Sequence, residues 1–385
     1  MPIVDAAVAL CAVGAEKTVS NEIKKLGLAV TESGFGRVRF KADQSGLYRA
    51  LMGLRAADRV LLEAGYFKAD DFDALFEGTR RLPWEEYIPN NQGLKVAKVR
   101  TNRSRLEAET SIQAVVHKAA AERLCTKRGL NRLPENENVA ELRVYLEKDW
   151  VSVLLDLSGD PLFKRGYRIK GGIAPLRETT AAAIILHSGW KRKFPLYDPF
   201  CGSGTIAIEA AMYAWDIAPG LGRRFALDRL LLSDRKTEHL VRDEFLSKVD
   251  FSRLVRIEGS DSDGAAVAAA RENLNRAIAL SSKREASPRV ALPSFKVLPM
   301  EESKSAEEEG FIITNPPYGR RLGETDSAEK NYAEMGKLAG NFSGWKLAVI
   351  TDNSGFESFF GKKADSCREI TNGAIRSYLY QYGKL

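Results

Sequence analysis

The stretch Leu196-Tyr-Asp-Pro-Phe-Cys-Gly-Ser-Gly-Thr205 decides the fold of the C-terminal half of this chain. Apolar residues lead to Asp198, a tight loop follows with Gly202 and Gly204, and an alanine-rich helix is expected after it. Ligands of open α/β sheets bind where strands end, and glycines let the backbone approach them closely. An acidic strand end before Gly-x-Gly suits a ligand that carries an ammonium group. A plain strand–turn–helix, with glycines needed only for its geometry, is the alternative.

The same loop excludes two common nucleotide-binding motifs. No lysine follows the second glycine, as a P-loop requires, and the third glycine of the dinucleotide fingerprint is missing. A second acidic strand end occurs at Gly259-Ser-Asp-Ser-Asp263. Asp261 or Asp263 could accept hydrogen bonds from both hydroxyls of a ribose, although Asp263 is also well suited to cap a helix. We expect Asp261 to bind the ribose and Asp263 to cap, and we place both at the ligand site.

The second decisive stretch is Phe311-Ile-Ile-Thr-Asn-Pro-Pro-Tyr-Gly319, in which an apolar strand ends in Asn315-Pro-Pro-Tyr318. Two prolines stiffen the chain and remove two backbone donors, so carbonyl groups remain free to accept. The Asn315 amide oxygen and the Pro316 carbonyl could together bind the two hydrogens of an NH2 group. Tyr318 could stack on a base, a contact worth about 1–3 kcal/mol. A rigid turn after a strand is the alternative for this motif alone.

Strands and helices alternate after residue 158, which predicts a mostly parallel sheet covered by helices on both faces. We expect strands at 195–199, 254–260, 294–298, 310–314 and 345–351, helices at 204–214, 264–278 and 328–341, and an antiparallel pair at 366–371 and 375–382. A glycine- and arginine-rich stretch, 158–172, precedes them. We therefore expect one α/β domain over 159–385.

The N-terminal half is predicted to hold two small α+β units, over 1–65 and 66–158. The first has strands at 5–13 and 38–40 and helices at 16–26 and 47–62, the second of which has Gly53 inside it. The other unit has helices at 72–77 and 111–128, a strand at 94–100, and a hairpin formed by 139–147 and 150–157.

The composition is that of a globular protein, with 44% hydrophobic and 28% charged residues. Its net charge of +7 suits a polyanionic partner such as nucleic acid, but does not require one. Four cysteines and three histidines are scattered without metal-site spacing, so we expect no metal and reduced thiols. No apolar segment is long enough for a membrane span, so we expect a cytoplasmic protein. Nothing in the sequence defines an oligomeric state.

The two decisive stretches resemble motifs of a known family. Asp198-Pro-Phe-Cys-Gly-Ser-Gly is similar to motif I of class I methyltransferases, and Asn315-Pro-Pro-Tyr to motif IV of those that methylate amino groups. The resemblance to the RlmL/YpsC-type 23S rRNA guanine-N2 methyltransferases extends over nearly the whole chain. It is carried also by Cys11-Ala-Val-Gly-Ala-Glu16, Leu162-Phe-Lys-Arg-Gly-Tyr-Arg168, Ala174-Pro-Leu-Arg-Glu178 and Ile217-Ala-Pro-Gly220.

This resemblance implies a Rossmann-like methyltransferase domain with a seven-stranded, mostly parallel sheet, preceded by a ferredoxin-like subdomain and a THUMP domain that binds RNA. It implies S-adenosylmethionine as the cofactor. The expected cofactor-binding residues are Asp198, Phe200, Gly202, Gly204, Thr205, Asp261, Asp263 and Glu301. The family has an aspartate near Pro299 for the adenine, so Glu301 or a backbone carbonyl is expected to replace it. The chain also has Gly319-Arg-Arg321 where the family shows Gly-Glu-Arg.

The expected reaction is direct transfer of a methyl group to the N2 amino group of a guanine, in 23S rRNA or in a precursor of the large ribosomal subunit. Asn315, Pro316 and Tyr318 are the expected catalytic residues. Phosphate contacts are expected from the five cations Lys95, Lys98, Arg100, Arg103 and Arg105, whose alternative is a solvated strand edge. A tRNA guanine-N2 methyltransferase, a DNA adenine-N6 methyltransferase and a non-catalytic RNA-binding assembly factor remain as alternatives.

Overall fold

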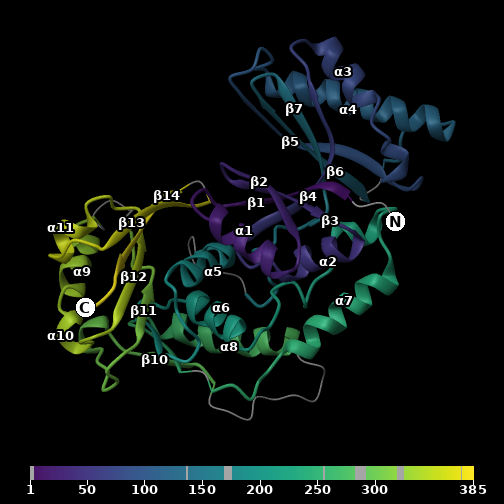
Figure 1. The fold of residues 1–385 in the computed structure, drawn as a ribbon. Helices are drawn as coiled ribbons and strands as arrows, with labels where there is room; N and C mark the ends of the chain where they lie inside the picture. Colours follow the sequence, from purple (N-terminus) through teal and green to yellow (C-terminus); the bar gives the residue numbers. More distant parts are fainter. Residues whose placement is uncertain are drawn as a thin grey trace.

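The computed structural model describes residues 4–135, 138–168, 176–254, 256–281, 292–318, 325–373 and 375–385. The chain forms two seven-stranded sheets, one in each half, with strand orders β2-β3-β1-β4-β7-β6-β5 and β10-β9-β8-β11-β12-β14-β13. Figure 1 shows them as separate layers, with the N-terminal sheet beside the domain formed by the C-terminal half. The expected architecture is present: an α/β domain with a mostly parallel seven-stranded sheet follows an α+β half.

The N-terminal sheet is antiparallel except for β5 and β6, which pair in parallel. Its strands are β1 (Val4–Cys11), β2 (Ala29–Gly34), β3 (Arg37–Ala42), β4 (Ala57–Lys68), β5 (Gly93–Asn102), β6 (Val139–Glu147) and β7 (Trp150–Asp156). Its helices are α1 (Glu16–Lys25), α2 (Gln44–Gly53), α3 (Phe72–Arg80) and α4 (Glu109–Arg128), with the 3-10 turn η1 (Trp84–Glu86).

The predicted helix over 47–62 is wrong in its second half. Helix α2 ends at Gly53, and β4 begins at Ala57 and continues to Lys68. Strand β4 pairs with β1 on one side and with β7 on the other. The two N-terminal units therefore share one sheet, and the expected boundary between residues 65 and 66 falls inside β4.

All four helices lie against the same face of this sheet. Leu62 of β4 is opposite Leu155 of β7, and both are buried in the core that the helices cover. Farther along β4, Phe67 lies directly beneath Gly78 of α3, where a Cβ would come within 2.2 Å of its ring. Side chains alternate between faces along a strand, so Leu61 and Leu154 point to the opposite side, where they form a separate small cluster with Val8.

The C-terminal sheet is parallel except for β14, which is antiparallel to both of its neighbours. Its strands are β8 (Leu196–Asp198), β9 (Ile257–Asp261), β10 (Ser294–Val297), β11 (Phe311–Thr314), β12 (Lys346–Thr351), β13 (Ser366–Asn372) and β14 (Ile375–Tyr382). Its helices are α5 (Glu178–His187), α6 (Thr205–Ala214), α7 (Arg235–Lys248), α8 (Gly264–Ser281), α9 (Thr325–Met335), α10 (Leu338–Asn341) and α11 (Phe356–Phe360), with the 3-10 turns η2 (Ala226–Arg229) and η3 (Met300–Glu302).

The expected strands are present in this domain, and two details differ. The helix expected over 328–341 is divided into α9 and α10 around Gly336, and helices α5, α7 and α11 were not anticipated. The two halves meet along a polar contact in which Thr371 donates its backbone N–H to the Val13 carbonyl and accepts the Val13 N–H on its hydroxyl, both near 3.0 Å. Gly14, with φ +92°, lies so close to Glu369 that a Cβ would come within 2.1 Å of the Glu369 carbonyl.

Candidate active site

The residues of the two decisive stretches meet at one edge of the C-terminal sheet. Strands β8, β9 and β11 are adjacent and parallel, so their carboxyl ends lie side by side. Asp198 ends β8, Asp261 ends β9, and Asn315 directly follows β11. The sheet therefore gathers at one edge residues that are up to 117 positions apart in the chain, from 198 to 315.

Asp198 is almost completely buried, with 1% of its surface exposed. Its Oδ1 accepts hydrogen bonds from the Thr314 hydroxyl (2.7 Å) and from the Phe200 N–H (3.2 Å). Burial raises the pKa of Asp198 to about 7, while these two hydrogen bonds lower it and the nearby Asp261 raises it further. Among the described residues Oδ2 accepts no hydrogen bond. A buried carboxylate with a free oxygen is suited to a cationic ligand group, which would stabilise its ionised form.

The glycine loop has the shape that a closely bound ligand requires. Gly202 (φ +50°) donates its N–H to Asp261 Oδ2 at 2.9 Å, and a Cβ there would point into open space. Gly204 (φ +84°) is the N-cap residue directly before α6, and a Cβ there would come within 2.9 Å of Ala270. Gly204 is therefore required by packing, whereas Gly202 leaves space where a ligand can approach the backbone.

The remaining expected cofactor residues lie around this loop. Asp263 accepts the N–H of Ala265 at 2.8 Å and so caps α8, as expected for this residue. Asp261 Oδ1 accepts the Asp263 N–H at 3.0 Å, so both of its oxygens help to shape the edge. Phe200 is half-buried against the cluster that contains Met300, and Glu301 is exposed on η3 directly after that methionine.

Thr205 is in contact with an ion pair, Arg168 and Glu178, whose residues were not predicted from the sequence to belong to the site. Its hydroxyl accepts a hydrogen bond from Arg168 Nη2 at 3.0 Å, and Arg168 Nε donates to Glu178 Oε1 at 2.8 Å. Glu178 is 4% exposed, and burial raises its pKa although Arg168 lowers it. Arg168 and Glu178 both belong to segments that carry the family resemblance, which is the signal that could have identified them. Residues 169–172, 174–175 and Gly319-Arg-Arg321 lie outside the described residues.

The Asn315-Pro-Pro-Tyr loop is held by hydrogen bonds from two tyrosines. The half-buried Tyr318 donates its hydroxyl to Asn315 Oδ1 at 2.7 Å. The fully buried Tyr332 of α9 donates to the Pro317 carbonyl at 3.2 Å, and its hydroxyl also lies 2.9 Å from the Thr351 hydroxyl. Asn315 is half-buried, and these hydrogen bonds hold its side chain and the loop backbone in place.

Cys201 is not suited to be a nucleophile, because burial and the nearby Asp198 raise its pKa and keep the thiol neutral. Within the described ranges, no group of His, Cys, Asp or Glu side chains has an arrangement that could hold a metal ion. No helix in those same ranges is long and apolar enough to cross a membrane.

The five expected RNA-binding cations occupy different surroundings. Lys98 and Arg100 line a large hollow of about 1130 Å³ between the N-terminal sheet and the C-terminal domain. Lys95 is paired with Glu141 and Arg105 with Asp70, both at 2.8 Å, and Arg103 is exposed in the loop after β5. The sheet thus brings only two of the five into this hollow. Four further cations line it without having been predicted: Arg37, Arg59, Arg143 and Arg177.

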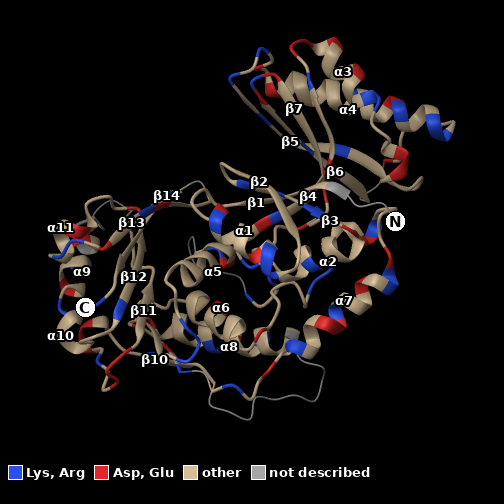
Figure 2. Ribbon diagram, in the orientation of Figure 1, with Lys and Arg blue, Asp and Glu red and all other residues tan. Residues whose placement is uncertain are grey.

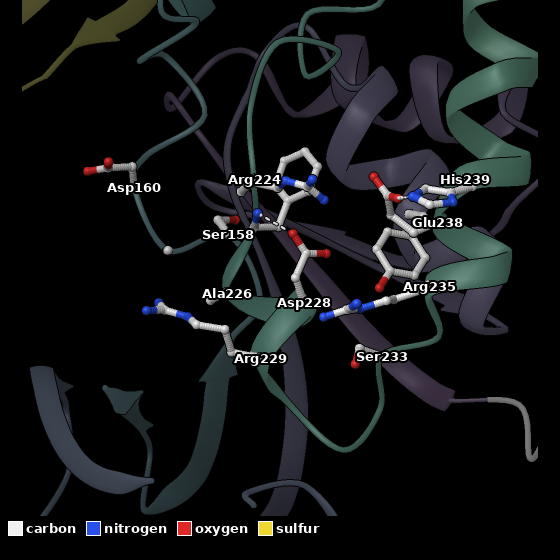
Figure 3. Close-up of a pocket in the computed structure, with 13 residues that line it drawn as sticks. Ser158, Asp160, Arg224, Ala226, Asp228, Arg229, Ser233, Arg235, Glu238 and His239 are labelled. Carbon is white, nitrogen blue, oxygen red and sulfur yellow. Dashed lines mark hydrogen bonds and ion pairs between the residues drawn. The ribbon is translucent and has the colours of Figure 1, made fainter. Parts of the chain in front are cut away.

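A smaller hollow of about 620 Å³ lies elsewhere, between the linker at Ser158–Asp160, η2 and α7 (Figure 3). Arg224, Arg229 and Arg235 surround it together with Asp228 and Glu238. It contains neither the glycine loop nor Asn315. It is therefore separate from the edge described above.

The fold and the edge together define a class I S-adenosylmethionine-dependent methyltransferase. Three family models match successive parts of the chain: the RlmL ferredoxin-like domain over 6–61, the THUMP domain over 69–156 and the RMKL-like methyltransferase domain over 165–381. The last match covers more than half of the chain. The protein belongs to the RMKL-like methyltransferase family, and its cofactor is S-adenosylmethionine.

Curated relatives agree with this assignment over almost the whole chain. YpsC of Bacillus subtilis, whose name places it among RNA methyltransferases, is 36% identical over 377 residues, which are 97% of this chain and 95% of YpsC. Ribosomal RNA large subunit methyltransferase K/L of Cellvibrio japonicus is 34% identical over 97% of this chain but only 50% of its own length. The chain thus spans nearly all of YpsC and about half of the K/L protein.

Solved structures are similar over the full length. SMU.472, named as a methyltransferase and complexed with SAH, has a TM-score of 0.88 at 36% identity and covers 100% of this chain and 99% of its own. A protein from Listeria monocytogenes, named as a predicted N6-adenine-specific DNA methylase, has a TM-score of 0.89 at 36% identity, with 99% and 96% covered. TrmN from Thermus thermophilus, at 19% identity and a TM-score of 0.69, shares the fold.

Proposed function

We propose that this protein transfers a methyl group from S-adenosylmethionine to the exocyclic N2 amino group of a guanine in RNA, and that the RNA is 23S rRNA. The observation that carries this proposal is the position of the Asn315 amide oxygen at the same sheet edge as Asp198 and the glycine loop. The names of the K/L relatives support ribosomal RNA of the large subunit as the substrate. The cytoplasmic location expected from the sequence suits such a substrate.

The glycine loop and its neighbours are proposed to hold the cofactor. Asp198 Oδ2 would bind the ammonium group of the methionine part, and Asp261 the ribose hydroxyls. Gly202, whose Cβ direction is open, would let the cofactor lie against the backbone. Phe200 and Glu301 lie on the side where the adenine would bind, while Thr205 and Asp263 shape the loop from α6 and α8. When bound, S-adenosylmethionine supplies an electrophilic methyl group on a sulfonium sulfur.

The Asn315-Pro-Pro-Tyr loop is proposed to orient the nucleophile. An amino group on a base is a poor nucleophile, because its lone pair is delocalised into the ring. Asn315 Oδ1 and the Pro316 carbonyl would accept its two hydrogens and direct the lone pair towards the methyl carbon. A carbonyl oxygen accepts two hydrogen bonds, so Asn315 could keep its bond from Tyr318. The amino nitrogen would take up the methyl group as the bond from that carbon to the sulfonium sulfur breaks, with a neutral thioether as the leaving group, and a proton would pass from the amino group to solvent.

Tyr318 is proposed to stack on the target base, which must leave its helix to reach this edge. The three-part division at 1–65, 66–158 and 159–385 remains our proposal for the domains. Within it, the THUMP domain would deliver the RNA. The three family matches fall inside these ranges and support the division.

The test is to incubate the purified protein with labelled S-adenosylmethionine and, separately, with unmodified 23S rRNA, tRNA and duplex DNA. Mass spectrometry of the digested products identifies the methylated nucleoside. We expect N2-methylguanosine from 23S rRNA. The same nucleoside from tRNA alone would change the substrate, and methyladenine from DNA, the reaction in the name of the Listeria relative, would refute the proposal. No transfer to any of them, with cofactor bound by calorimetry, would favour a non-catalytic assembly factor.

Asn315→Ala tests the role of the Asn315 amide oxygen separately from cofactor binding. It removes the amide oxygen without touching the residues around the cofactor, so transfer should be lost while the affinity for S-adenosylmethionine is nearly unchanged. Loss of cofactor binding in this variant would contradict the role given to Asn315.

A further inference from the structure

The N-terminal sheet has a concave face that no helix covers within the described residues. Arg37 on β3 and Glu147 on β6 form an ion pair at 2.6 Å, although β1, β4 and β7 lie between their strands. In a flat sheet these two strands would be about 19 Å apart, because neighbouring strands are spaced by about 4.8 Å. The sheet is therefore strongly curved, with this face on the inside. We call it the concave face; it comprises the outward residues of β1, β3, β4, β5, β6 and β7.

The hollow of about 1130 Å³ lies at the end of the concave face that meets the C-terminal domain. Six cations line it, against two acidic residues, Asp58 and Glu147; the six are Arg37, Arg59, Lys98, Arg100, Arg143 and Arg177. Figure 2 shows basic positions on β3 and β5, whose side chains contribute to this wall. The hollow has the charge of a site for a polyanion.

Lys98 differs from the five arginines of this wall, each of which is paired with a carboxylate. It is half-buried, and among the described residues no carboxylate forms an ion pair with it. Burial lowers its pKa, and the neighbouring Arg100, Arg143 and Arg59 lower it further by repulsion. A phosphate group placed among them would relieve this repulsion. Arg59 and Arg143 are already held by one carboxylate, that of the buried Asp156, which fixes their position on the wall.

The concave face also carries an exposed pair of aromatic rings. Tyr66 of β4 and Trp150 of β7 stack with centroids 5.0 Å apart and an angle of 14°, and they are 55% and 44% exposed. The register places them on the concave side: Tyr66 is opposite Ser152, which is opposite Tyr145, and Tyr145 lines the hollow. Arg39 lies 5.4 Å from the Tyr66 ring. Exposed rings beside cations are the combination that binds unpaired bases by stacking.

The hollow opens towards the edge that holds Asn315. Thr371 and Gly373, at the turn between β13 and β14, line it. Tyr378 of β14 pairs with Thr351, the last residue of β12, so this turn projects beyond the same sheet edge that β11 reaches with Asn315. A strand of nucleic acid held on the concave face would therefore reach the same edge of the C-terminal sheet as the catalytic loop.

We infer that the concave face binds a single-stranded segment of the RNA substrate, with bases stacked on Tyr66 and Trp150 and phosphates held by Lys98 and its neighbouring arginines. This inference rests on the proposed function and adds to it the form of RNA that is recognised. Double-stranded RNA offers no unstacked base to an exposed ring and is recognised by shape and backbone. The aromatic pair therefore favours an unpaired loop or a strand end.

The test measures binding of the full-length protein to fluorescently labelled RNA by anisotropy, with an unpaired oligoribonucleotide and a duplex of the same length. Tyr66→Ala combined with Trp150→Ala should weaken binding of the unpaired RNA by about tenfold or more and leave the duplex nearly unchanged. Trp150→Phe keeps a stacking ring and should retain most of the affinity. Lys98→Gln should weaken binding of the unpaired RNA about fivefold at low salt and reduce the salt slope by about one.

Matched controls come from the helix side of the same sheet. Phe72→Ala on α3 removes an exposed ring, and Lys118→Ala on α4 removes an exposed cation; neither should change RNA binding. Unchanged binding in the Tyr66/Trp150 variant, equal losses for unpaired and duplex RNA, or equal losses in the controls would overturn the inference. Circular dichroism of each variant shows whether a loss of RNA binding comes from the changed concave face or from misfolding of the variant.

The readouts also separate this inference from the proposed function. If the wild-type protein produces N2-methylguanosine and the variants bind unpaired RNA normally, the function stands and the inference fails. If the variants no longer bind unpaired RNA while the wild-type protein methylates a different base, the inference stands and the proposed target atom is wrong.

Discussion

Thr314 and Asp198 are 116 residues apart in the chain, and the Thr314 hydroxyl donates a hydrogen bond of 2.7 Å to Asp198 Oδ1. The bond joins the end of β11 to the end of β8, and thus the catalytic loop to the glycine loop. This hydrogen bond lowers the pKa of Asp198, whereas burial raises it. The two halves of the proposed site therefore share one buried contact.

Thr314→Val should weaken S-adenosylmethionine binding about tenfold, because the unsupported Asp198 becomes harder to ionise. Calorimetry between about pH 6 and pH 9 should show that the affinity of the variant for S-adenosylmethionine rises with pH, as in the wild type, but that the midpoint of this rise lies at a higher pH. Thr79→Val is the control, since the Thr79 hydroxyl is buried on α3 and has no partner in the described part of the chain. Equal losses in both variants would contradict a specific role for Thr314.

Asp198→Asn should stabilise the ligand-free protein at neutral and alkaline pH while it weakens cofactor binding. The pKa of an unfolded aspartate is about 3.9, and that of Asp198 is about 7. Between these values the folded state binds more protons, so stability falls as pH rises through this window. Asparagine can accept both hydrogen bonds that now go to Oδ1, and it carries no charge to bury. Thermal unfolding should show an advantage of up to about 4 kcal/mol that grows from about pH 4 to pH 8; an advantage that stays constant with pH would refute it.

Two glycine variants should separate folding from binding. Gly204→Ala places a Cβ 2.9 Å from Ala270 at a φ of +84°, so unfolding free energy should fall by about 1–3 kcal/mol. Gly202→Ala places its Cβ in open space at φ +50°, so it should cost only about 1 kcal/mol of stability but should impair cofactor binding. Denaturant unfolding and calorimetry on both variants check the contrast. The reverse order of effects would show that the loop binds its ligand in another way.

Tyr332→Phe should lower kcat about tenfold and leave the KM for S-adenosylmethionine unchanged. The variant removes the hydroxyl that holds the Pro317 carbonyl, so the catalytic loop loses its support while the cofactor residues remain. Tyr382→Phe is the control, because Tyr382 is equally buried but donates its hydroxyl to the backbone carbonyl of Lys362, away from the catalytic loop. A matching loss of kcat in the control would indicate a general effect of packing.

Tyr318→Phe and Tyr318→Ala should differ strongly in rate. Phenylalanine keeps the ring proposed to stack on the base and loses only the hydroxyl that binds Asn315. Alanine removes both, which should raise the KM for RNA as well as lower kcat. Steady-state kinetics on the identified RNA gives both constants. Equal kinetics of the two variants would exclude a stacking role for the ring.

The site elements could be predicted from sequence because each is local. Asp198 and Asp261 end their strands and Asn315 directly follows its strand, and parallel strands end at a common edge. The prediction of a helix over 47–62 was wrong because the local spacing of apolar residues did not show where the helix ends and the strand begins. Leu51, Leu54 and Val60 fit a helical spacing, but the chain turns between Gly53 and Ala57, and Val60 points into the core from a strand.

The concave face could not be found in this way. Arg37, Arg143 and Arg177 line one hollow although they come from β3, β6 and the residue before α5. The alternating Arg37-Val-Arg-Phe-Lys41 pattern shows that β3 has one charged side, but not what that side faces. Curvature of the sheet and its contact with the C-terminal domain bring these cations together, and neither is encoded in a short stretch.

Because β4 pairs with both β1 and β7, it limits which segments can be exchanged between related proteins. A cut between the first two units would divide a single strand and expose β7 as an unpaired edge, which invites aggregation. A chimaera that replaces only the RNA-binding unit should therefore misassemble, whereas one that transplants residues 1–158 together keeps every strand of the sheet with its partners. During evolution the two units are accordingly expected to have been inherited as a single piece.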